Sequence, residues 1–450
     1  MKTVSLKIEK EYECDVLVCG GGVSGFSAAV SSARNGAKTI LIESGGFLGG
    51  TATKGLVSPF MTCYDAKGEN QIIRGLFSEL IERLESEGGC IHPSNPECRN
   101  GSSYAGYRSA GHIGVTPFDQ EVLKRVAEKM CLEAGVKLLY HTTLIGCEKD
   151  GDMLTHVYAT DGNSILSIKA KTFIDTTGSA KLADKAGALT IHGNDDGTVQ
   201  TATLFCMISG VDKKALDEYM ENHNDMRSRF FMDKFEAGQK DGSFPCGTQK
   251  LRIYETPGGL WAVNMAQVDD RFNELDGEEV TNAEISQREQ LVKIIEFLRK
   301  NIVGLENIKL VYSASDIGIR ESRRIVGKTV LSLDNIRNST KFDDRIAVCA
   351  NSIDIHQKVG VSYTAHNNEN YYIPLSCLIS KNVSNLLTAG KSLSADKYAF
   401  AAVRVMPPCI AMGQAAGITA SLAALNNIPA ADVPYKEVQR LLTENGAYLD

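Results

Sequence analysis

The chain has 450 residues, of which 43% are hydrophobic and 23% are charged, and its formal net charge is −7. This composition is typical of globular proteins and excludes a mostly disordered chain, a fibre or a small disulfide-stapled scaffold. A net acidic chain has no overall field that attracts nucleic acid, so we expect no nucleic-acid partner.

The sequence also argues against a metal centre and a membrane span. Its 12 cysteines include no Cys-x-x-Cys pair, the spacing that zinc and iron–sulfur sites usually require. The first fifteen residues are rich in charge, and no long uncharged apolar run occurs in the chain. We therefore expect a cytoplasmic protein with reduced cysteines, no metal and no membrane span, and we leave its oligomeric state open.

A strand–helix–strand unit is predicted between residues 15 and 43. An apolar strand over 15–19 leads directly into Gly-Gly-Gly-Val-Ser-Gly at 20–25, and a helix rich in small residues follows over 26–34. A second apolar strand over 39–42 ends at Glu43. This arrangement matches the dinucleotide-binding motif G-x-G-x-x-G in its required βαβ context.

Each glycine of the motif has a physical role in binding a dinucleotide. Gly20 permits the tight turn, Gly22 lets the backbone approach a pyrophosphate, and Gly25 lets the helix pack close to the strand. The helix N-terminus offers N–H groups and a positive dipole end to the phosphates. The carboxylate of Glu43 can accept hydrogen bonds from a ribose.

The segment from Ser44 to Thr53 is too rich in glycine to form another helix. Such a stretch favours close backbone approach to a second part of the same ligand. A nicotinamide cofactor does not require this segment, whereas a ligand that continues past the pyrophosphate, as a flavin does, would contact it.

The central part of the chain predicts a mixture of helices and strands. A strand at 172–178 ends at Gly178 and precedes a short helix. The other expected elements are helices over 118–134, 179–186, 212–240 and 280–300, a strand over 137–145, and a small β-hairpin or meander over 151–172 that turns at Asp161-Gly162.

The C-terminal part contains another strand, 385–390, which ends at Gly390. Residues 404–417 begin a helix rich in small residues, with Pro407 and Pro408 in its first turn, where a missing N–H group is tolerated. Small residues would let a flat ligand lie against the start of this helix. Close packing between helices explains them equally well.

Together these segments resemble the FAD-dependent oxidoreductases of the glutathione-reductase-type superfamily. The narrower resemblance is to a bacterial FAD-dependent oxidoreductase family related to fumarate reductase and heterodisulfide reductase flavoproteins, and it includes Asp-Ile-Gly-Ile-Arg-Glu-Ser-Arg-Arg at 316–324. The resemblance implies an α/β fold with a Rossmann-like FAD-binding domain built from discontinuous segments and an inserted α+β substrate or cap domain. The expected segments are 1–60, 115–190 and 345–450 for FAD, and 61–114 and 191–344 for the cap.

The resemblance further implies a set of residues that binds FAD without a covalent link. Gly178 would approach the adenosine half and Gly390 the ribityl–phosphate part. The segment 413–417 would place a helix N-terminus near the flavin C2 carbonyl, where its dipole stabilises the reduced anionic ring. The expected FAD-binding residues are Gly20, Gly22, Val23, Ser24, Gly25, Glu43, Ser44, Gly49, Gly50, Thr51, Ala52, Leu144, Thr177, Gly178, Gly390, Lys391, Gly413, Gln414, Ala415 and Ala416.

Candidate catalytic residues come from three places. Arg320 belongs to a cluster with Arg323 and Arg324 that would share a helix face and could bind a carboxylate or phosphate. A salt-bridged packing element explains at least two of these arginines. His356, after a predicted strand at 346–350, is the candidate acid or base, and Tyr372 could present its phenol to the same cavity.

We expect the protein to transfer a hydride between flavin N5 and a small organic substrate of unknown identity. Relatives carry Ser-x-Thr-His where this chain has Ser-Ala-Asp-Lys-Tyr at 394–398, which leaves the substrate and the mechanism open. Two alternatives remain: an electron-transferring flavoprotein subunit that acts with a partner protein, and a protein that holds FAD without catalysing a reaction.

Overall fold

In the computed structural model, the described residues are 5–99, 101–107, 113–194, 197–223, 230–356, 361–364 and 369–450. A five-stranded sheet has the order β19-β8-β2-β3-β4. Its paired strands are all parallel. The strands are Val16–Cys19 (β2), Thr39–Ile42 (β3), Lys137–Leu139 (β4), Thr172–Asp175 (β8) and Leu386–Thr388 (β19).

The sheet confirms the predicted α/β class and the assembly from discontinuous segments. Its five strands come from parts of the chain as distant as residues 16 and 388. Every residue of β2, β3, β8 and β19 is buried. Short, mainly apolar strands that are fully buried are typical of a parallel sheet that is covered on both faces.

Several smaller sheets surround this centre. A meander has the order β1-β7-β6-β5, with Lys10–Glu13 (β1), Thr143–Asp150 (β5), Met153–Thr160 (β6) and Ile165–Lys169 (β7). The two-stranded pairs are Thr190–Ile191 (β9) with Arg324–Ile325 (β14), Arg345–Cys349 (β15) with Tyr371–Pro374 (β18), and Ile353–His356 (β16) with Val361–Thr364 (β17).

The helices around the parallel sheet are Val23–Arg34 (α1), Leu76–Ser86 (α2), Gln120–Glu133 (α3), Lys181–Lys185 (α4), Leu333–Arg337 (α8), Lys397–Val403 (α9), Met406–Asn426 (α10) and Tyr435–Glu444 (α11). Short 3-10 turns lie at Gly50–Ala52, Pro96–Cys98, Leu375–Cys377 and Ala430–Asp432.

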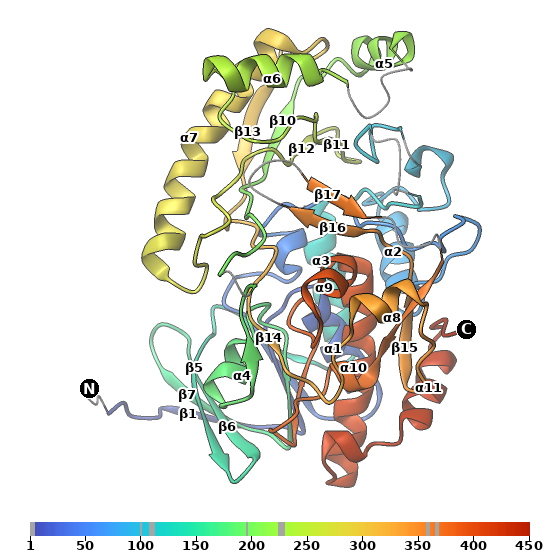
Figure 1. The fold of residues 1–450 in the computed structure, drawn as a ribbon. Helices are drawn as coiled ribbons and strands as arrows, with labels where there is room; N and C mark the ends of the chain where they lie inside the picture. The colour runs from blue at the N-terminus through green and yellow to red at the C-terminus, as the bar shows by residue number, and fades with distance from the viewer. Residues whose placement is uncertain are drawn as a thin grey trace.

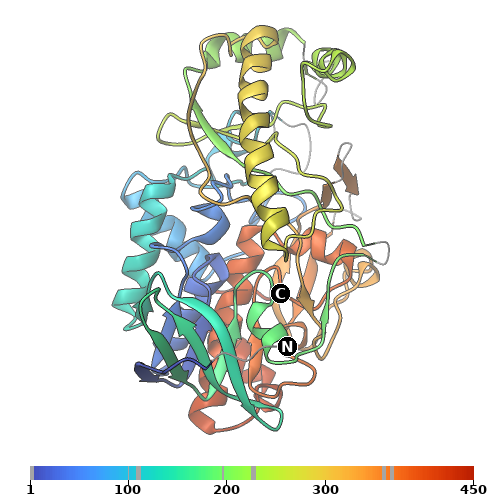
Figure 2. The same cartoon turned by 90° about the vertical axis from the view of Figure 1, so that its left-hand side faces the viewer.

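A second hydrophobic core lies in the upper part of the molecule (Figures 1 and 2). It surrounds an antiparallel sheet with the order β11-β12-β10-β13, and the long helix α7, drawn in yellow, rises along it in Figure 2. The elements are Cys206–Ser209 (β10), Ile253–Glu255 (β11), Trp261–Val263 (β12), Lys309–Ser313 (β13), Lys213–Asn222 (α5), Met232–Asp241 (α6) and Gly277–Asn301 (α7).

The cores do not follow the expected domain limits everywhere. Residues of α2, expected on the cap side, pack in the first core with α3 and α10. Leu331 and Ile336, also expected in the cap, belong to that first core as well. Tyr107 packs in the second core. The proposed division into domains remains a prediction. The packing of α2, Leu331 and Ile336 in the first core suggests that these residues belong with the FAD-binding segments.

Three local predictions differ from the structure. The strand over 137–145 is two strands, β4 and β5, because the chain turns between them at His141, which has a φ of 49°. The helix over 212–240 is two helices, α5 and α6, and residues 224–229 between them lie outside the described residues. Arg320 and Arg323 are not on a helix, since residues 318–323 are irregular and β14 begins at Arg324.

The helix α10 owes its small residues to packing against α1. A Cβ atom on Gly413 would overlap the carbonyl oxygen of Ser24, and one on Gly417 would overlap that of Ala28. Serines of α1 also donate across the contact, Ser27 Oγ to the carbonyl oxygen of Ile410 at 2.7 Å. Within the described chain, α10 is the one helix long and apolar enough to cross a membrane, yet 89% of its most apolar window is buried inside the fold.

We expect Gly413→Ala to lower the free energy of unfolding by about 1–3 kcal/mol, because the added methyl group has no room between the two helices. Gly277→Ala at the start of α7 is the matched control, since nothing lies within 4 Å of its Cβ position. Urea unfolding of both variants measures the effect. Equal stability of the two variants would contradict the packing role of Gly413.

Candidate functional site

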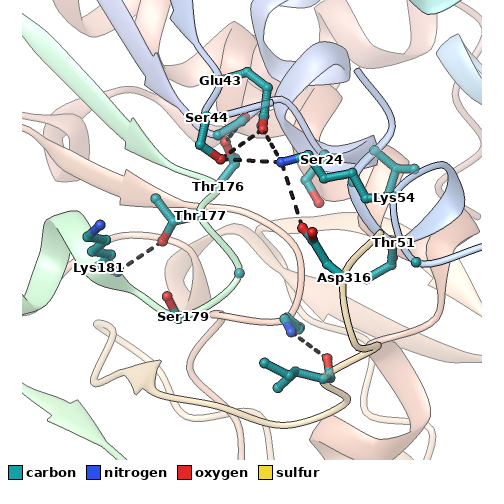
Figure 3. A pocket seen from close by; sticks show the side chains of 18 of the residues that line it. Ser24, Glu43, Ser44, Thr51, Lys54, Thr176, Thr177, Ser179, Lys181 and Asp316 are labelled. Carbon is teal, nitrogen blue, oxygen red and sulfur yellow. Dashed lines mark hydrogen bonds and ion pairs between the residues drawn. The ribbon is translucent and has the colours of Figure 1, made fainter. Parts of the chain in front are cut away.

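A cavity of about 560 Å³ lies at the carboxyl ends of β2, β3 and β8 (Figure 3). This edge is where parallel α/β sheets bind their ligands. Many of the residues expected to bind FAD line it: Gly20, Gly22, Val23, Ser24, Glu43, Ser44, Gly50, Thr51, Leu144, Thr177, Gly178 and Lys391.

The turn between β2 and α1 is built to admit an anion. Gly22 caps α1 without any side-chain hydrogen bond, and the first turn of the helix carries no acidic residue. A Cβ on Gly22 would meet only the Cα of Gly50, at 3.9 Å, so this face of the turn is open. Gly25 is different, because a Cβ there would overlap the carbonyl oxygen of Gly20. Gly22 therefore borders the ligand space, and Gly25 serves the close packing of the turn.

Glu43 connects the turn to the loop that follows β3. Its Oε2 accepts from the Gly21 amide at 2.7 Å, and its Oε1 accepts from the Gly45 amide at 2.7 Å and from Lys54 Nζ at 2.8 Å. Burial acts to raise the pKa of this carboxyl, but Lys54 and the two amides hold it below its usual value. Figure 3 shows Lys54 between Glu43 and Asp316, whose Oδ2 lies 3.8 Å from Nζ.

Some expected FAD-binding residues support the wall without lining it. Gly49 donates to the Gly21 carbonyl at 2.8 Å, and Ala52 is buried in the turn beyond it. Gly390 lies behind Ser24, whose Oγ its Cβ would overlap. These residues therefore shape the cavity from behind.

The structure places Gly413, Gln414, Ala415 and Ala416 away from the expected position at a helix N-terminus. They lie two turns inside α10 rather than at its N-terminus, and none lines either cavity of the site. The Gln414 side chain accepts instead from the amide of Leu76 at 3.0 Å. Of α10, the residues that line the cavity are Met406 and Cys409 in its first turn.

A second cavity, of about 140 Å³, adjoins the first. Residues common to both walls are Thr51, Ile319, Lys391, Arg404 and Met406. Two of the expected catalytic residues, His356 and Arg320, line this second cavity. Sequence patterns did not single out Asp354, Arg404, Asn264, Tyr254 and Phe205, which also line it.

The three arginines of the 320–324 cluster have different partners and lie in different surroundings. Arg320 faces the second cavity and donates to the carbonyl of Thr201 (2.7 Å), to Thr203 Oγ1 (2.7 Å) and to Asn264 Oδ1 (2.9 Å). Arg323 forms an ion pair with Asp184 at 2.7 Å, and Arg324 forms a buried one with Glu321 at 2.5 Å. The latter two are therefore packing residues.

Both ring nitrogens of His356 are engaged. Its Nε2 lies 3.1 Å from Asp354 Oδ2, and its Nδ1 lies 3.4 Å from Arg252 Nη1. Burial, and next the positive charge of Arg320, hold the pKa of this imidazole well below its usual value, so the ring is neutral near pH 7. Because Arg252 can only donate, we assign the ring proton to Nε2, which donates to Asp354.

The structure does not place Tyr372 in the cavity that His356 lines. Its ring is half-buried on β18, lines neither cavity, and lies under Lys341 Nζ at 5.7 Å. Alternate residues of a strand face opposite sides, and on β18 the inward residue is Tyr371, whose hydroxyl donates to the carbonyl of Asn351 at 3.1 Å.

Lys391 lies where the two cavities meet. Its Nζ donates to the carbonyl oxygen of Ile319 at 2.5 Å. Burial lowers the pKa of this ammonium to about 8, although Glu274 acts to raise it. Its charge state therefore changes within the range in which the protein can be studied.

We expect the FAD affinity of the apoprotein to fall as the pH rises above about 8. An anionic cofactor binds the charged lysine better, so affinity is greatest below the pKa of Lys391 in the apoprotein, which is about 8, and declines above it. Fluorescence titration with FAD between pH 7 and 9.5 measures the decline. The Lys391→Met variant should bind more weakly at pH 7 and show no such slope, and an unchanged slope would contradict this role.

The residues that line the first cavity match the parts of FAD. The open face of Gly22, the uncapped start of α1 and the carboxylate at the end of β3 match a pyrophosphate and its ribose. The cavity continues past them to Thr51, Lys391 and the start of α10, which leaves room for a ligand longer than a nucleotide. Glu274 and Glu284, from the segment expected to form the cap, contribute acidic side chains to this wall.

The parallel sheet, the dinucleotide turn and the extended cavity define a Rossmann-like flavoprotein. A family model described as FAD dependent oxidoreductase matches residues 15–442. The chain belongs to this family of FAD-dependent oxidoreductases.

Curated relatives match part of the chain. A digeranylgeranylglycerophospholipid reductase of Methanocaldococcus jannaschii is 31% identical over 176 residues, or 38% of this chain and 40% of the relative. A glutathione reductase of Yarrowia lipolytica is 30% identical over 176 residues, or 39% of this chain and 34% of the relative. The chain thus matches well under half the length of these relatives.

Among solved structures, a geranylgeranyl bacteriochlorophyll reductase-like protein from Thermoplasma acidophilum is similar, with a TM-score of 0.47 and 14% identity. The match covers 97% of this chain and 85% of that one.

The cysteines and the candidate metal ligands are dispersed over the described parts of the chain. All 12 cysteines are free thiols. Among the residues that the structure describes, no three His, Cys, Asp or Glu side chains gather in a way that could hold a metal ion. Asp396 and Lys397 stand at the positions where a histidine was expected from the family resemblance. The Asp396 side chain caps α9, and Lys397 is exposed.

Proposed function

We propose that this FAD-dependent oxidoreductase transfers a hydride between flavin N5 and a small organic molecule held in the second cavity. The observation that carries the proposal is the shared wall of the two cavities at Thr51, Lys391 and Arg404. A cofactor that fills the first cavity from the dinucleotide turn onwards would end at this wall. A molecule in the second cavity would then lie beside it.

The chain's own residues would orient the molecule and set its charge environment. Arg320 is held in place by three neutral acceptors and presents a fixed cation to the second cavity. Asp354 links the ring of His356 to Arg404. The Oδ2 atom of Asp354 lies 3.1 Å from His356 Nε2 and 3.4 Å from Arg404 Nη2. We propose Arg320 as a binding residue and His356 as the acid–base residue, which holds its proton at Nε2 beside Asp354. When bound, FAD supplies the hydride donor or acceptor.

The proposal is tested on the holoenzyme under anaerobic conditions. Oxidised protein is screened for metabolites that bleach the flavin, and chemically reduced protein is screened for metabolites that restore its colour. We expect one of the two screens to find a small molecule. If neither does and a partner protein alone changes the flavin colour, the protein is an electron-transferring subunit. If nothing changes the colour, it holds FAD without catalysis.

We expect Met61→Trp to abolish the response to any small molecule found in this way, because the indole would occupy the second cavity that Met61 lines. The FAD content and reduction by dithionite should be unchanged. Met153→Trp is the matched control, since Met153 is 45% exposed on β6. A full response in Met61→Trp would place the reacting molecule outside this cavity.

A further inference from the structure

The long helix α7 has apolar residues on its solvent side. Ile285 is 54% exposed and Val292 is 52% exposed, although α7 already buries another apolar face in the second core. Figure 2 shows α7 on the outside of the molecule, with its length turned toward the viewer. A helix on the surface of a globular protein normally has polar residues on its solvent side. Two apolar residues that flank the midpoint of this side therefore need an explanation.

These two residues belong to a seven-residue repeat. Glu278, Ile285, Val292 and Arg299 follow one another at intervals of seven residues, and all four are exposed. Seven residues are almost two helical turns, so the four residues form one row along the helix. The row begins with an acid, continues with the two apolar residues and ends with a base.

A row with this order is complementary to a second copy of itself. Two identical helices that pack across a two-fold axis perpendicular to them run antiparallel, so each row meets the other in reverse order. If Ile285 lies opposite the partner's Val292, then Glu278 lies opposite the partner's Arg299. The register that joins the apolar residues therefore also joins opposite charges. A parallel arrangement would instead place like charges opposite each other.

The charges at the centre of α7 are a more specific signal than those at its ends. An acid at the start of a helix and a base at its end also suit the helix dipole, so the end charges alone do not indicate a partner. In the same register, however, Arg288 lies opposite the partner's Glu289, next to the two-fold axis. Within the described part of the chain Glu289 forms no ion pair. Arg288 pairs with Glu284 of its own helix at 2.7 Å but remains 51% exposed, so it can contact a second carboxylate.

The size of this face predicts a moderate affinity. A helix of 25 residues is about 37 Å long and about 10 Å wide, so each of two paired helices would cover about 400 Å² of the other. A standard interface covers about 800 Å² per partner. The strand β13, which contacts α7, adds the exposed residues Leu310 (39%) and Val311 (47%). The expected dimer therefore dissociates in the micromolar range, on the order of the weaker known complexes.

We infer that this face of α7 is the interface of a homodimer, in which the two α7 helices pack antiparallel across a two-fold axis. Ile285 packs on the partner's Val292, and Arg288 forms an ion pair with the partner's Glu289. The inference does not depend on the proposed function, because these residues line neither cavity.

Sedimentation velocity of the FAD-loaded protein between about 1 and 100 µM tests the inference. We expect the sedimentation coefficient to rise with concentration from that of a monomer to that of a dimer. Ile285→Asp should weaken association about tenfold or more, because it places a carboxylate against the apolar centre of the interface twice. Leu132→Asp is the matched control, since Leu132 is 58% exposed on α3, and it should leave association unchanged.

Charge reversals test the register. Glu289→Arg places like charges opposite each other on both sides of the axis and should weaken association about tenfold or more. The double variant Arg288→Glu, Glu289→Arg restores opposite charges and should recover most of the lost affinity. A residue with only a structural role within its own helix would show no such recovery. Thermal melting and FAD content show that each variant is folded and loaded.

Three outcomes would overturn the inference. A protein that is a monomer at every concentration would leave this face to a partner of another kind. A dimer that Ile285→Asp leaves intact would use a different surface. A dimer that Glu289→Arg weakens and the double variant does not recover would exclude this register. The proposed function is tested separately, by the flavin colour, and none of these outcomes contradicts it.

Discussion

Gly25→Ala is expected to prevent assembly of a stable holoenzyme. Its new methyl group would overlap the carbonyl oxygen of Gly20 and crowd Thr176 Oγ1, so the turn between β2 and α1 must open. Overpacking at such a site costs about 3 kcal/mol or more of unfolding free energy. We expect a lower melting temperature of the apoprotein and no retained FAD. Thermal denaturation and the flavin content after purification measure the two effects.

Gly22→Ala separates cofactor binding from folding. Its φ of −65° suits any residue, and its Cβ would meet nothing closer than 3.9 Å. The apoprotein should therefore keep its stability, while FAD affinity falls about tenfold to a hundredfold because the methyl group occupies the open face of the turn. Equal FAD affinity in Gly22→Ala and the natural protein would contradict the placement of the pyrophosphate at this turn.

Glu321→Gln is expected to lower the free energy of unfolding by about 3–5 kcal/mol. The side chains of Glu321 and Arg324 are 2% and 4% exposed, and loss of the carboxylate leaves a buried cation without its counter-ion. The double variant Glu321→Gln, Arg324→Met should regain much of this loss, since the Met side chain can pack on the ring of Phe400, where the guanidinium now lies at 5.0 Å.

Urea unfolding of the apoprotein measures the series, and Glu437→Gln in an exposed pair with Arg440 is the control, for which we expect no change. A double variant less stable than Glu321→Gln alone would show that Arg324 stabilises the fold by contacts other than this ion pair. Full stability of Glu321→Gln would contradict the packing role assigned to both residues.

The dinucleotide half of the site could be predicted because its signals are local. Gly20, Gly22 and Glu43 belong to one strand–helix–strand unit, and short-range patterns decide their positions. The same holds for Gly178, which lies three residues after the end of β8. Small residues in α10 were ambiguous, because Gly413 and its neighbours satisfy either a flat ligand or a neighbouring helix, and the packing against α1 decides for the helix.

The second cavity could be predicted only in part. Arg320 and His356 were selected by residue type, but the cavity exists because distant segments meet, among them β16 with His356 and the end of α9, where Arg404 is the C-cap. No spacing in the sequence relates Asp354 to Arg404 or Asn264 to Arg320. The strand direction that turns Tyr372 away from the cavity also depends on how β18 pairs with β15.

The visible absorption spectrum of the purified protein, before and after heat precipitation, tests the central claim most directly. The account predicts flavin bands, and a yellow supernatant after heating whose pigment chromatographs as FAD. Yellow colour retained in the pellet would show a covalent link and contradict the expected non-covalent binding. A colourless protein that takes up no added FAD would contradict the assignment of the first cavity to this cofactor.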